Sequence, residues 1–311
     1  MRKKISLIGA GSVGGACAQR LAERNYADLV LLDIVPGRAE GKALDIYQSG
    51  PVLGFDSSVV GVTDDYEATA DSDVVVISAG VPRNPEIKSR DDLLFINQKI
   101  IESVAKKTAE YSPKCIMITI TNPLDAMVQL AWHASGLPRS RVIGMSGVLD
   151  TARFRTFVAM ELGVSIEDVF AYVLGGHGDT MVPLARLTTV GGIPITDLMP
   201  PETIQRIVDR TRNGGGELVK LLKTMSTFTA PSAAVCAMVD SVLLDKKRII
   251  PCATYLNGEY CIKGLFMGVP VKLGMCGIEQ IIQIKLAPEE EQALKDSAAN
   301  IRELIDKMNL H

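Results

Sequence analysis

A glycine-rich turn between a short apolar run and a helical pattern constrains the fold of this chain most strongly. The apolar run spans Ile5–Ile8, the turn reads GAGSVG and contains Gly9, Gly11 and Gly14, and an amphipathic pattern follows over residues 13–24. In such a turn the first glycine permits a sharp reversal, the second lets a ligand approach the backbone, and the third lets the helix pack closely on the strand. The segment predicts a strand, a turn and a helix in that order.

The first half of the chain repeats this alternation of strand-like and helical segments. Short aliphatic and β-branched runs predict strands at Ile5–Ile8, Leu29–Leu32, Val74–Ser78, Ile116–Ile120 and Val142–Ile143. Amphipathic patterns predict helices at Val13–Arg24, Gly37–Gln48, Asp91–Tyr111 and Leu124–Ser135. Strands separated by helices favour a parallel sheet, and nearly continuous apolar strands suit burial on both faces. We therefore predict an α/β fold with a Rossmann-type, doubly wound parallel sheet.

After about Gly144 the pattern becomes mixed. A helix is predicted at Val148–Leu162 and a long one at Pro288–Met308, while Asn213–Gly216 predicts a helix break. The strand-like segments of this half are Val169–Val173, Pro183–Thr188, Ile249–Leu256, Tyr260–Lys263 and Val269–Leu273. We expect two domains, a doubly wound one over residues 1–144 and a mixed α+β one over residues 145–311.

An acidic residue follows the glycine-rich turn at the distance that dinucleotide-binding folds use. Asp33 ends the second predicted strand, 19 residues after Gly14. A carboxylate there can accept hydrogen bonds from the ribose hydroxyls of a bound dinucleotide, while the start of the first helix attracts its phosphates. Because the same carboxylate would repel a 2′-phosphate, we predict NAD as the cofactor rather than NADP.

One of the three histidines lies in a glycine-rich segment that is typical of a catalytic loop. His177 is surrounded by small residues in GGHGD, whereas His133 follows Trp132 in a helical pattern and His311 ends the chain. Histidine titrates near neutral pH, which suits it to transfer a proton. His177 is therefore the candidate acid and base.

Charge and cysteine spacing exclude several classes of protein. The formal net charge is −3 and the isoelectric point is about 5.7, so we expect no nucleic-acid or membrane partner. The six cysteines are scattered without a CxxC pair, so we expect reduced thiols and no metal site. No segment reaches the roughly 20 apolar residues that span a bilayer. These features predict a cytoplasmic protein.

Further motifs, taken in order along the chain, resemble those of the lactate and malate dehydrogenases. The resemblance covers nearly the whole length and is strongest to the malate dehydrogenases that are built like lactate dehydrogenase. The motifs that carry it are GAGSVG, LLDIVPGRAEGKALD, SAGVPRNP, SRDDLL, TNPLDAM, MSGVLDTARFR, GGHGD and LDKK. The resemblance implies an NAD-dependent enzyme with an NAD-binding domain at residues 1–144 and a substrate and catalytic domain at residues 145–311.

The resemblance also implies roles for individual residues of the reaction site. His177 matches the family's acid and base, and Asp150 matches the carboxylate that orients it. Arg153 lies one helical turn after Asp150, where its guanidinium can bind a substrate carboxylate with two hydrogen bonds. Arg90 matches the arginine on the lid that polarises the substrate carbonyl, and Asn122 matches an asparagine that binds substrate near the nicotinamide.

Cofactor contacts and assembly are likewise expected from the resemblance. Asn97 and the backbone of Ile120, Thr121 and Asn122 match family contacts to NAD, in addition to Gly9, Gly11, Gly14 and Asp33. The peptide bond between Asn122 and Pro123 is expected to be cis. The segment Gly41–Asp45 resembles the helix through which the family pairs its subunits, so we expect a homodimer or homotetramer.

Arg83 determines which 2-hydroxy acid the resemblance favours. Arginine at this lid position is typical of malate dehydrogenases, and a second substrate carboxylate needs a cation in a closed site. We therefore predict reversible hydride transfer between malate or oxaloacetate and NAD(H). Residues 83–90 are one residue longer than the usual lid and lack its glycine, and Met225 replaces a common glycine. Lactate or another 2-hydroxy acid thus stays an alternative, and a non-catalytic NAD-binding sensor is a third hypothesis.

Overall fold

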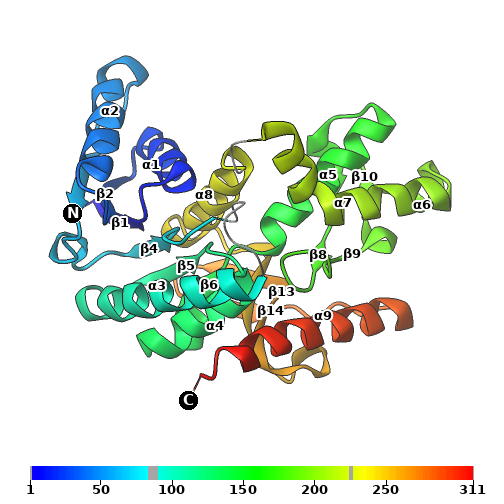
Figure 1. The fold of residues 1–311 in the computed structure, drawn as a ribbon. Helices are drawn as coiled ribbons and strands as arrows, with labels where there is room; N and C mark the ends of the chain where they lie inside the picture. The colour runs from blue at the N-terminus through cyan, green and yellow to red at the C-terminus, as the bar shows by residue number, and fades with distance from the viewer. Residues whose placement is uncertain (1, 83–89, 224–226, 311) are drawn as a thin grey trace.

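The fold is built on one nine-stranded sheet. The computed structural model describes residues 2–82, 90–223 and 227–310. Within them the strands of this sheet lie in the order β14-β13-β12-β6-β5-β4-β1-β2-β3 (Figure 1). Their bounds are β1 Lys3–Ile8, β2 Ala27–Asp33, β3 Val59–Thr63, β4 Val74–Ile77, β5 Ile116–Thr119, β6 Val142–Gly144, β12 Arg248–Asn257, β13 Lys263–Gly274 and β14 Gly277–Ile281. The neighbours from β3 to β6 pair in parallel and those from β6 to β14 pair antiparallel.

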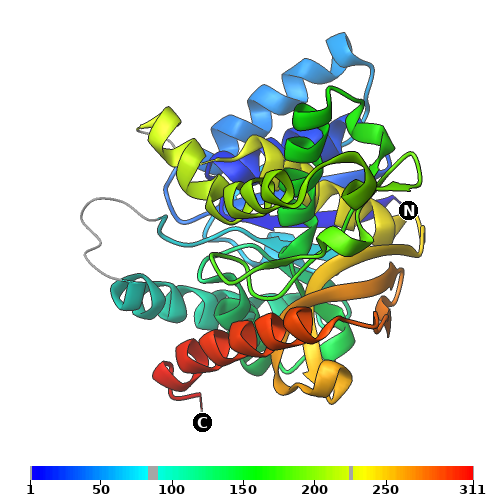
Figure 2. The same ribbon diagram turned by 90° about the vertical axis from the view of Figure 1, so that its right-hand side faces the viewer.

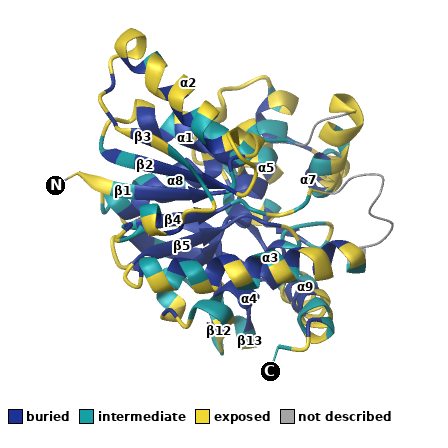
Figure 3. Cartoon of the chain, turned by 60° about the vertical axis from the view of Figure 1, so that its left-hand side comes forward, coloured by how far each residue is buried: buried dark blue, intermediate teal, exposed yellow. Residues whose placement is uncertain are grey.

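The parallel strands are buried because helices cover both faces of the sheet. In β4, Val74 and Val76 join the core on one face while Val75 and Ile77 join the core on the other. The first face is covered by α1 Ser12–Glu23, α2 Arg38–Leu53 and α8 Thr229–Leu243, and the second by α3 Arg90–Tyr111 and α4 Leu124–Ser135. Figure 3 shows the buried sheet between helices whose outer faces are exposed. The predicted Rossmann-type α/β fold is therefore confirmed.

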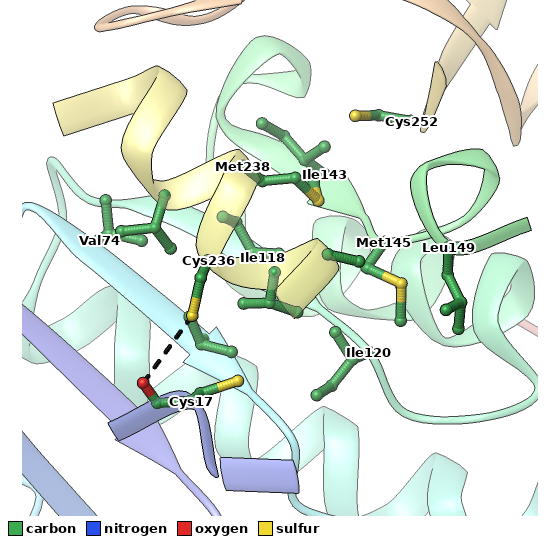
Figure 4. Packing of buried hydrophobic residues seen from close by; sticks show 14 of the residues in the cluster. Cys17, Val74, Ile118, Ile120, Ile143, Met145, Leu149, Cys236, Met238 and Cys252 are labelled. Atoms are coloured by element: carbon green, nitrogen blue, oxygen red, sulfur yellow. Dashed lines mark hydrogen bonds between the residues drawn. The ribbon is translucent and has the colours of Figure 1, made fainter. Parts of the chain in front are cut away.

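The close-up in Figure 4 shows how α1 and α8 pack on the sheet. Cys17 of α1 and Cys236 of α8 are fully buried, and the thiol of Cys236 lies 3.9 Å from the carbonyl oxygen of Cys17. All six cysteines of the chain are free. Small side chains at this contact let the two helices approach each other beside the strands.

The second half adds smaller elements around a separate core. Its helices are α5 Gly147–Leu162, α6 Ile195–Leu198, α7 Pro201–Leu222 and α9 Pro288–Lys307, and its short strands are β7 Val169–Phe170, β8 Val173–Leu174, β9 Val182–Pro183, β10 Thr189–Val190 and β11 Ile193–Pro194. Phe154 and Val158 of α5 pack there against Ile207 of α7. The end of α9 lies beside the start of α3 (Figure 2), where Lys307 pairs with Asp91 at 3.0 Å.

Most predicted elements are present, but two predicted strands form 3₁₀ turns instead. The predicted strand Pro183–Thr188 was wrong, because after Pro183 the chain forms a 3₁₀ turn at Ala185–Leu187 with a hydrogen bond from Thr188 N–H to the Ala185 carbonyl. The predicted strand Tyr260–Lys263 was also wrong. It is mainly a 3₁₀ turn, and the Tyr260 hydroxyl holds it by donating to the Ile282 carbonyl at 2.7 Å.

The glycine run at Asn213–Gly216 does not break a helix, contrary to the prediction. It lies inside α7, which continues from Pro201 to Leu222. Glycine lowers helix stability but does not forbid the helix when packing holds it. Four strands of the structure were not predicted, namely β3, β10, β11 and β14. Among the described residues, no helix combines the length and apolar character needed to cross a membrane.

Candidate active site

The glycine-rich turn connects β1 to α1 at the carboxyl edge of the parallel strands. Gly9 has a φ of +102°, and a Cβ there would lie 2.6 Å from the Ala79 backbone nitrogen. A Cβ on Gly14 would lie 1.9 Å from the Gly9 carbonyl oxygen. These two positions therefore require glycine for the turn itself, because a side chain at either would collide with backbone.

Gly11 differs from these two glycines because open space surrounds it. An added Cβ there meets no heavy atom within 4 Å among the described residues. Gly11 also precedes the first turn of α1, which carries no acidic side chain. An anion at this point would be attracted by the free N–H groups at the start of the helix. The turn thus fits a dinucleotide pyrophosphate.

Asp33 is held at the end of β2, beside the turn. Its Oδ2 accepts a hydrogen bond from the Ala10 N–H at 2.8 Å, and its Oδ1 accepts one from the Val35 N–H at 3.0 Å. The Arg38 guanidinium lies 3.5 Å from Oδ1. The buried carboxylate therefore fixes the turn and places negative charge where the ribose of a dinucleotide would lie.

The strand β5 leads to the next group of predicted residues. Ile120 and Thr121 are buried, Asn122 is exposed, and the peptide bond between Asn122 and Pro123 is cis, as predicted. The Thr121 hydroxyl donates to the Ala79 carbonyl at 2.6 Å. This segment lies next to the turn because β5 and β1 both flank β4.

The Asn97 side chain ties this segment together. Its Nδ2 donates to the Asn122 carbonyl at 2.7 Å, and its Oδ1 accepts from the Val81 N–H at 2.8 Å. Asn97 is fully buried in α3. In this structure the amide holds the backbone of two loops, and a direct contact to the cofactor stays a prediction.

His177, Asp150 and Arg153 form one hydrogen-bonded group. The His177 Nδ1 lies 2.8 Å from Asp150 Oδ2, and the Arg153 Nη1 donates to Asp150 Oδ1 at 3.2 Å. Asp150 and Arg153 come from the same face of α5, one turn apart. The Asp150 side chain is 1% exposed and the other two are each 13% exposed. One buried carboxylate thus orients both an imidazole and a guanidinium.

The surroundings of His177 change its proton affinity. Burial has the largest effect and favours the neutral imidazole, but the charge of Asp150 and its hydrogen bond outweigh it, so the pKa of His177 is raised above its ordinary value. Arg153 opposes this shift, and Asp125 adds to it. The raised pKa favours the protonated imidazole, which is the form that can donate a proton to a substrate oxygen.

Two residues support the His177 loop that sequence reasoning missed. Asp125, in the first turn of α4, accepts the His177 backbone N–H at 2.8 Å, and burial raises the pKa of its carboxyl to about 6. The Ser297 hydroxyl of α9 accepts the Gly176 N–H at 2.8 Å. Asp125 could have been found from the sequence, because a carboxylate in the otherwise apolar start of α4 indicates a buried polar role. Ser297 could not, because a serine in a charged helix is ordinary.

Asp125 also joins the two groups in space. It follows Asn122 and Pro123 by a few residues, and its carboxylate contacts the loop of His177. The predicted cofactor residues and the predicted acid and base therefore lie on one edge of the sheet. Two predicted substrate residues cannot be assigned to this edge, because Arg83 and the side chain of Arg90 lie outside the described part of the chain.

Two family models together match nearly the whole chain. The lactate/malate dehydrogenase NAD-binding domain matches residues 3–144, and the lactate/malate dehydrogenase alpha/beta C-terminal domain matches residues 147–310.

Individual relatives agree with these matches. A malate dehydrogenase of Thermomicrobium roseum is 57% identical over 99% of both chains. The crystal structure of a Cryptosporidium parvum malate dehydrogenase superposes with a TM-score of 0.96 at 44% identity and covers 99% of both chains. A lactate dehydrogenase of the same organism, complexed with lactic acid and nicotinamide adenine dinucleotide, also reaches 0.96, at 42% identity, and covers 99% of this chain and 98% of its own. The fold is thus shared by enzymes of either name.

Proposed function

This chain belongs to the lactate/malate dehydrogenase family, and we infer that it is an NAD-dependent malate dehydrogenase. The reaction is the reversible transfer of a hydride between malate and NAD, which forms oxaloacetate and NADH. The observation that carries this inference is the group in which Asp150 contacts both His177 at 2.8 Å and Arg153 at 3.2 Å. A proton donor and a cation that can bind a carboxylate are thus held side by side. Reduction of a 2-keto acid requires both groups.

We propose that His177 moves the proton of the reaction. When NADH is held by the glycine-rich turn and Asp33, it would supply the hydride for the substrate carbon. The Asp150 carboxylate accepts the hydrogen bond of Nδ1–H, which leaves the proton on Nε2 directed away from Asp150 and available to the carbonyl oxygen. In the reverse direction the neutral imidazole accepts the hydroxyl proton of malate, and the buried Asp150 stabilises the imidazolium that forms.

We propose that arginines bind the two carboxylates of the substrate. Arg153 would hold the C1 carboxylate with its planar fork, since its guanidinium is already aligned by Asp150. Arg83 would pair with the second carboxylate, and Arg90 would polarise the substrate carbonyl. Asn122 would bind the substrate near the nicotinamide. The burial of Arg153 supports its part, because a charge-assisted hydrogen bond is strongest where water is excluded.

The cofactor is NAD. We propose that the chain has two domains with different roles and that the boundary lies at residue 144. Residues 1–144 would bind NAD through the turn at Gly9, Gly11 and Gly14, through Asp33, and through Asn97 and residues 120–122. Residues 145–311 would bind the dicarboxylate and carry the acid and base. The three antiparallel strands of this second part nonetheless complete the sheet of the first.

We also propose that the enzyme is a cytoplasmic homodimer or homotetramer. The helix α2 supports assembly through Gly41–Asp45 and its surroundings, because Leu44 is 57% exposed and Tyr47 is 52% exposed on its outer face. Exposed apolar side chains that are close together favour burial between subunits. The free thiols support a reducing compartment.

The function is tested by steady-state oxidation of NADH by the purified protein with oxaloacetate and, separately, with pyruvate. We expect rapid turnover with oxaloacetate, far slower turnover with pyruvate, and a marked loss when NADPH replaces NADH. Preference for pyruvate would make the chain a lactate dehydrogenase, which the equal structural similarity to both Cryptosporidium enzymes allows. Binding of NADH without turnover of any 2-keto acid would instead indicate a sensor.

A further inference from the structure

The glycine run inside α7 lies directly against the substrate-binding arginine. A Cβ added to Gly214 would lie 3.3 Å from Arg153 Cδ and 3.6 Å from Cε2 of Phe157. A Cβ added to Gly215 would lie 3.7 and 3.9 Å from the two terminal nitrogens of the Arg153 guanidinium. A Cβ added to Gly216 would meet nothing within 4 Å among the described residues. Contact with Arg153 therefore decreases along the run.

The helix is reinforced on both sides of this run. Arg210 and Glu217 form two hydrogen bonds of 2.8 and 3.0 Å across it. The Arg210 guanidinium also lies 4.2 Å above the ring of Phe157, which belongs to α5. Three successive glycines weaken a helix, and these contacts help to keep α7 continuous through them.

Arg153 has little freedom to move away from α7. Its Nη1 is bonded to Asp150, which also bonds His177, and its side chain is 13% exposed. Its buried Nε has no hydrogen-bond partner among the described residues. The aliphatic part of Arg153 thus depends on packing, rather than on a hydrogen bond at Nε, for its position against α7.

We propose that Gly214 and Gly215 are positioning residues for Arg153. Their missing side chains let the backbone of α7 lie against the arginine, which fixes where its guanidinium meets the substrate carboxylate. Gly214 sets the position of the aliphatic part, and Gly215 leaves room beside the guanidinium. The proposal rests on the proposed function of Arg153, and it assigns the glycine run to substrate binding rather than to the shape of the helix alone.

The test compares Gly214→Ala, Gly215→Ala and Gly216→Ala in the full-length enzyme. We expect Gly214→Ala to raise the KM for oxaloacetate roughly tenfold, which is less than the hundredfold that a 1 Å misplacement can cost. Gly215→Ala should raise it less, and Gly216→Ala should leave it unchanged. The KM for NADH should stay constant in all three. Gly216→Ala should also raise Tm by about 1 to 3 °C, since alanine is the better helix former.

A double-mutant cycle separates positioning from a general structural effect. We expect Gly214→Ala to lower kcat/KM in the wild-type background but to have no further effect beside Arg153→Ala. An equal loss in both backgrounds, or equal KM values in the three alanine variants, would overturn the proposal. If Gly214→Ala does not fold, the milder Gly215→Ala takes its place in the cycle. If pyruvate proves to be the substrate, the proposed function fails but the cycle is run with pyruvate, which carries the same C1 carboxylate.

Discussion

The turn at residues 9–14 and the group around His177 lie on the same edge of the sheet, yet the chain builds them in different ways. The turn depends on missing side chains, because a Cβ on Gly9 or Gly14 would lie within 3 Å of backbone. The group depends on buried charges, because Asp150 bonds both His177 and Arg153. In the function we propose, the first provides a shape for the cofactor, and the second provides a proton donor and a positive charge for the substrate. Cofactor binding and proton transfer should therefore respond separately to substitution.

His177→Ala is expected to separate the catalytic rate from NADH binding most strongly. Loss of general acid catalysis should lower kcat by roughly 10² to 10⁴, while the NADH affinity stays unchanged because the turn is untouched. Steady-state rates and titration of NADH fluorescence measure the two effects. His133→Ala, which removes an exposed histidine of α4, is the matched control and should alter neither. More than half of the wild-type activity in His177→Ala would show that another residue supplies the proton.

Asp150→Asn should change the pH dependence without changing NADH binding. The negative charge of Asp150 helps to raise the pKa of His177, so its removal lowers that pKa. Reduction of oxaloacetate needs the protonated imidazole, so the pH above which the rate falls should move to a lower value. The profile of kcat/KM against pH checks this. An unmoved profile would mean that Asp150 does not control the proton on His177.

Arg153→Lys keeps the positive charge but removes the planar fork. We expect the KM for oxaloacetate to rise by roughly one to two orders of magnitude, which is the value of one hydrogen bond to a charged group. Arg155→Lys is the control, since Arg155 lies on the same helix and donates to the Ile166 carbonyl instead. The account loses its carboxylate-binding residue if the two variants behave alike.

Gly11→Ala, in the glycine-rich turn, should have the opposite effect: it should weaken NADH binding and leave proton transfer unchanged. The added methyl group meets open space rather than backbone, so the fold should persist while the cofactor phosphates are pushed outward. The KM for NADH should rise by roughly an order of magnitude, and the pH profile should not move. Unchanged NADH kinetics would show that the cofactor does not approach Gly11.

The same contrast explains what the sequence allowed us to predict. The turn, Asp33 and the buried strands were predictable because each depends on neighbours in the chain: α4 was predicted at its observed bounds, and β2 ends at Asp33. The residues that support the His177 loop were not predictable from the sequence. Asp125 and Ser297 contact this loop from segments 52 and about 120 residues away. Distant partners leave no periodic pattern.

The incorrect predictions also come from tertiary context. The glycines at 214–216 were interpreted as a break because their local propensity is poor, but the contact with α5 favours a continuous helix. In the same way, the apolar residues near Tyr260 predict a strand from their sequence alone. In the structure they form a turn, because the Tyr260 hydroxyl donates to the Ile282 carbonyl. Local pattern therefore gave the frame of the fold, and packing between distant segments determined these turns and the continuity of α7.

The most direct test of the account is the ratio of kcat/KM for oxaloacetate to that for pyruvate, measured with NADH in the wild type and in Arg83→Gln. Oxaloacetate brings a second carboxylate, and leaving a buried charge without its partner costs about 3 to 5 kcal/mol, which is about two to four orders of magnitude in kcat/KM. We predict that the wild type strongly prefers oxaloacetate and that Arg83→Gln narrows or inverts the ratio. A wild type that prefers pyruvate, or a ratio that Arg83→Gln leaves unmoved, would contradict the assignment of this chain as a malate dehydrogenase that selects its substrate through Arg83.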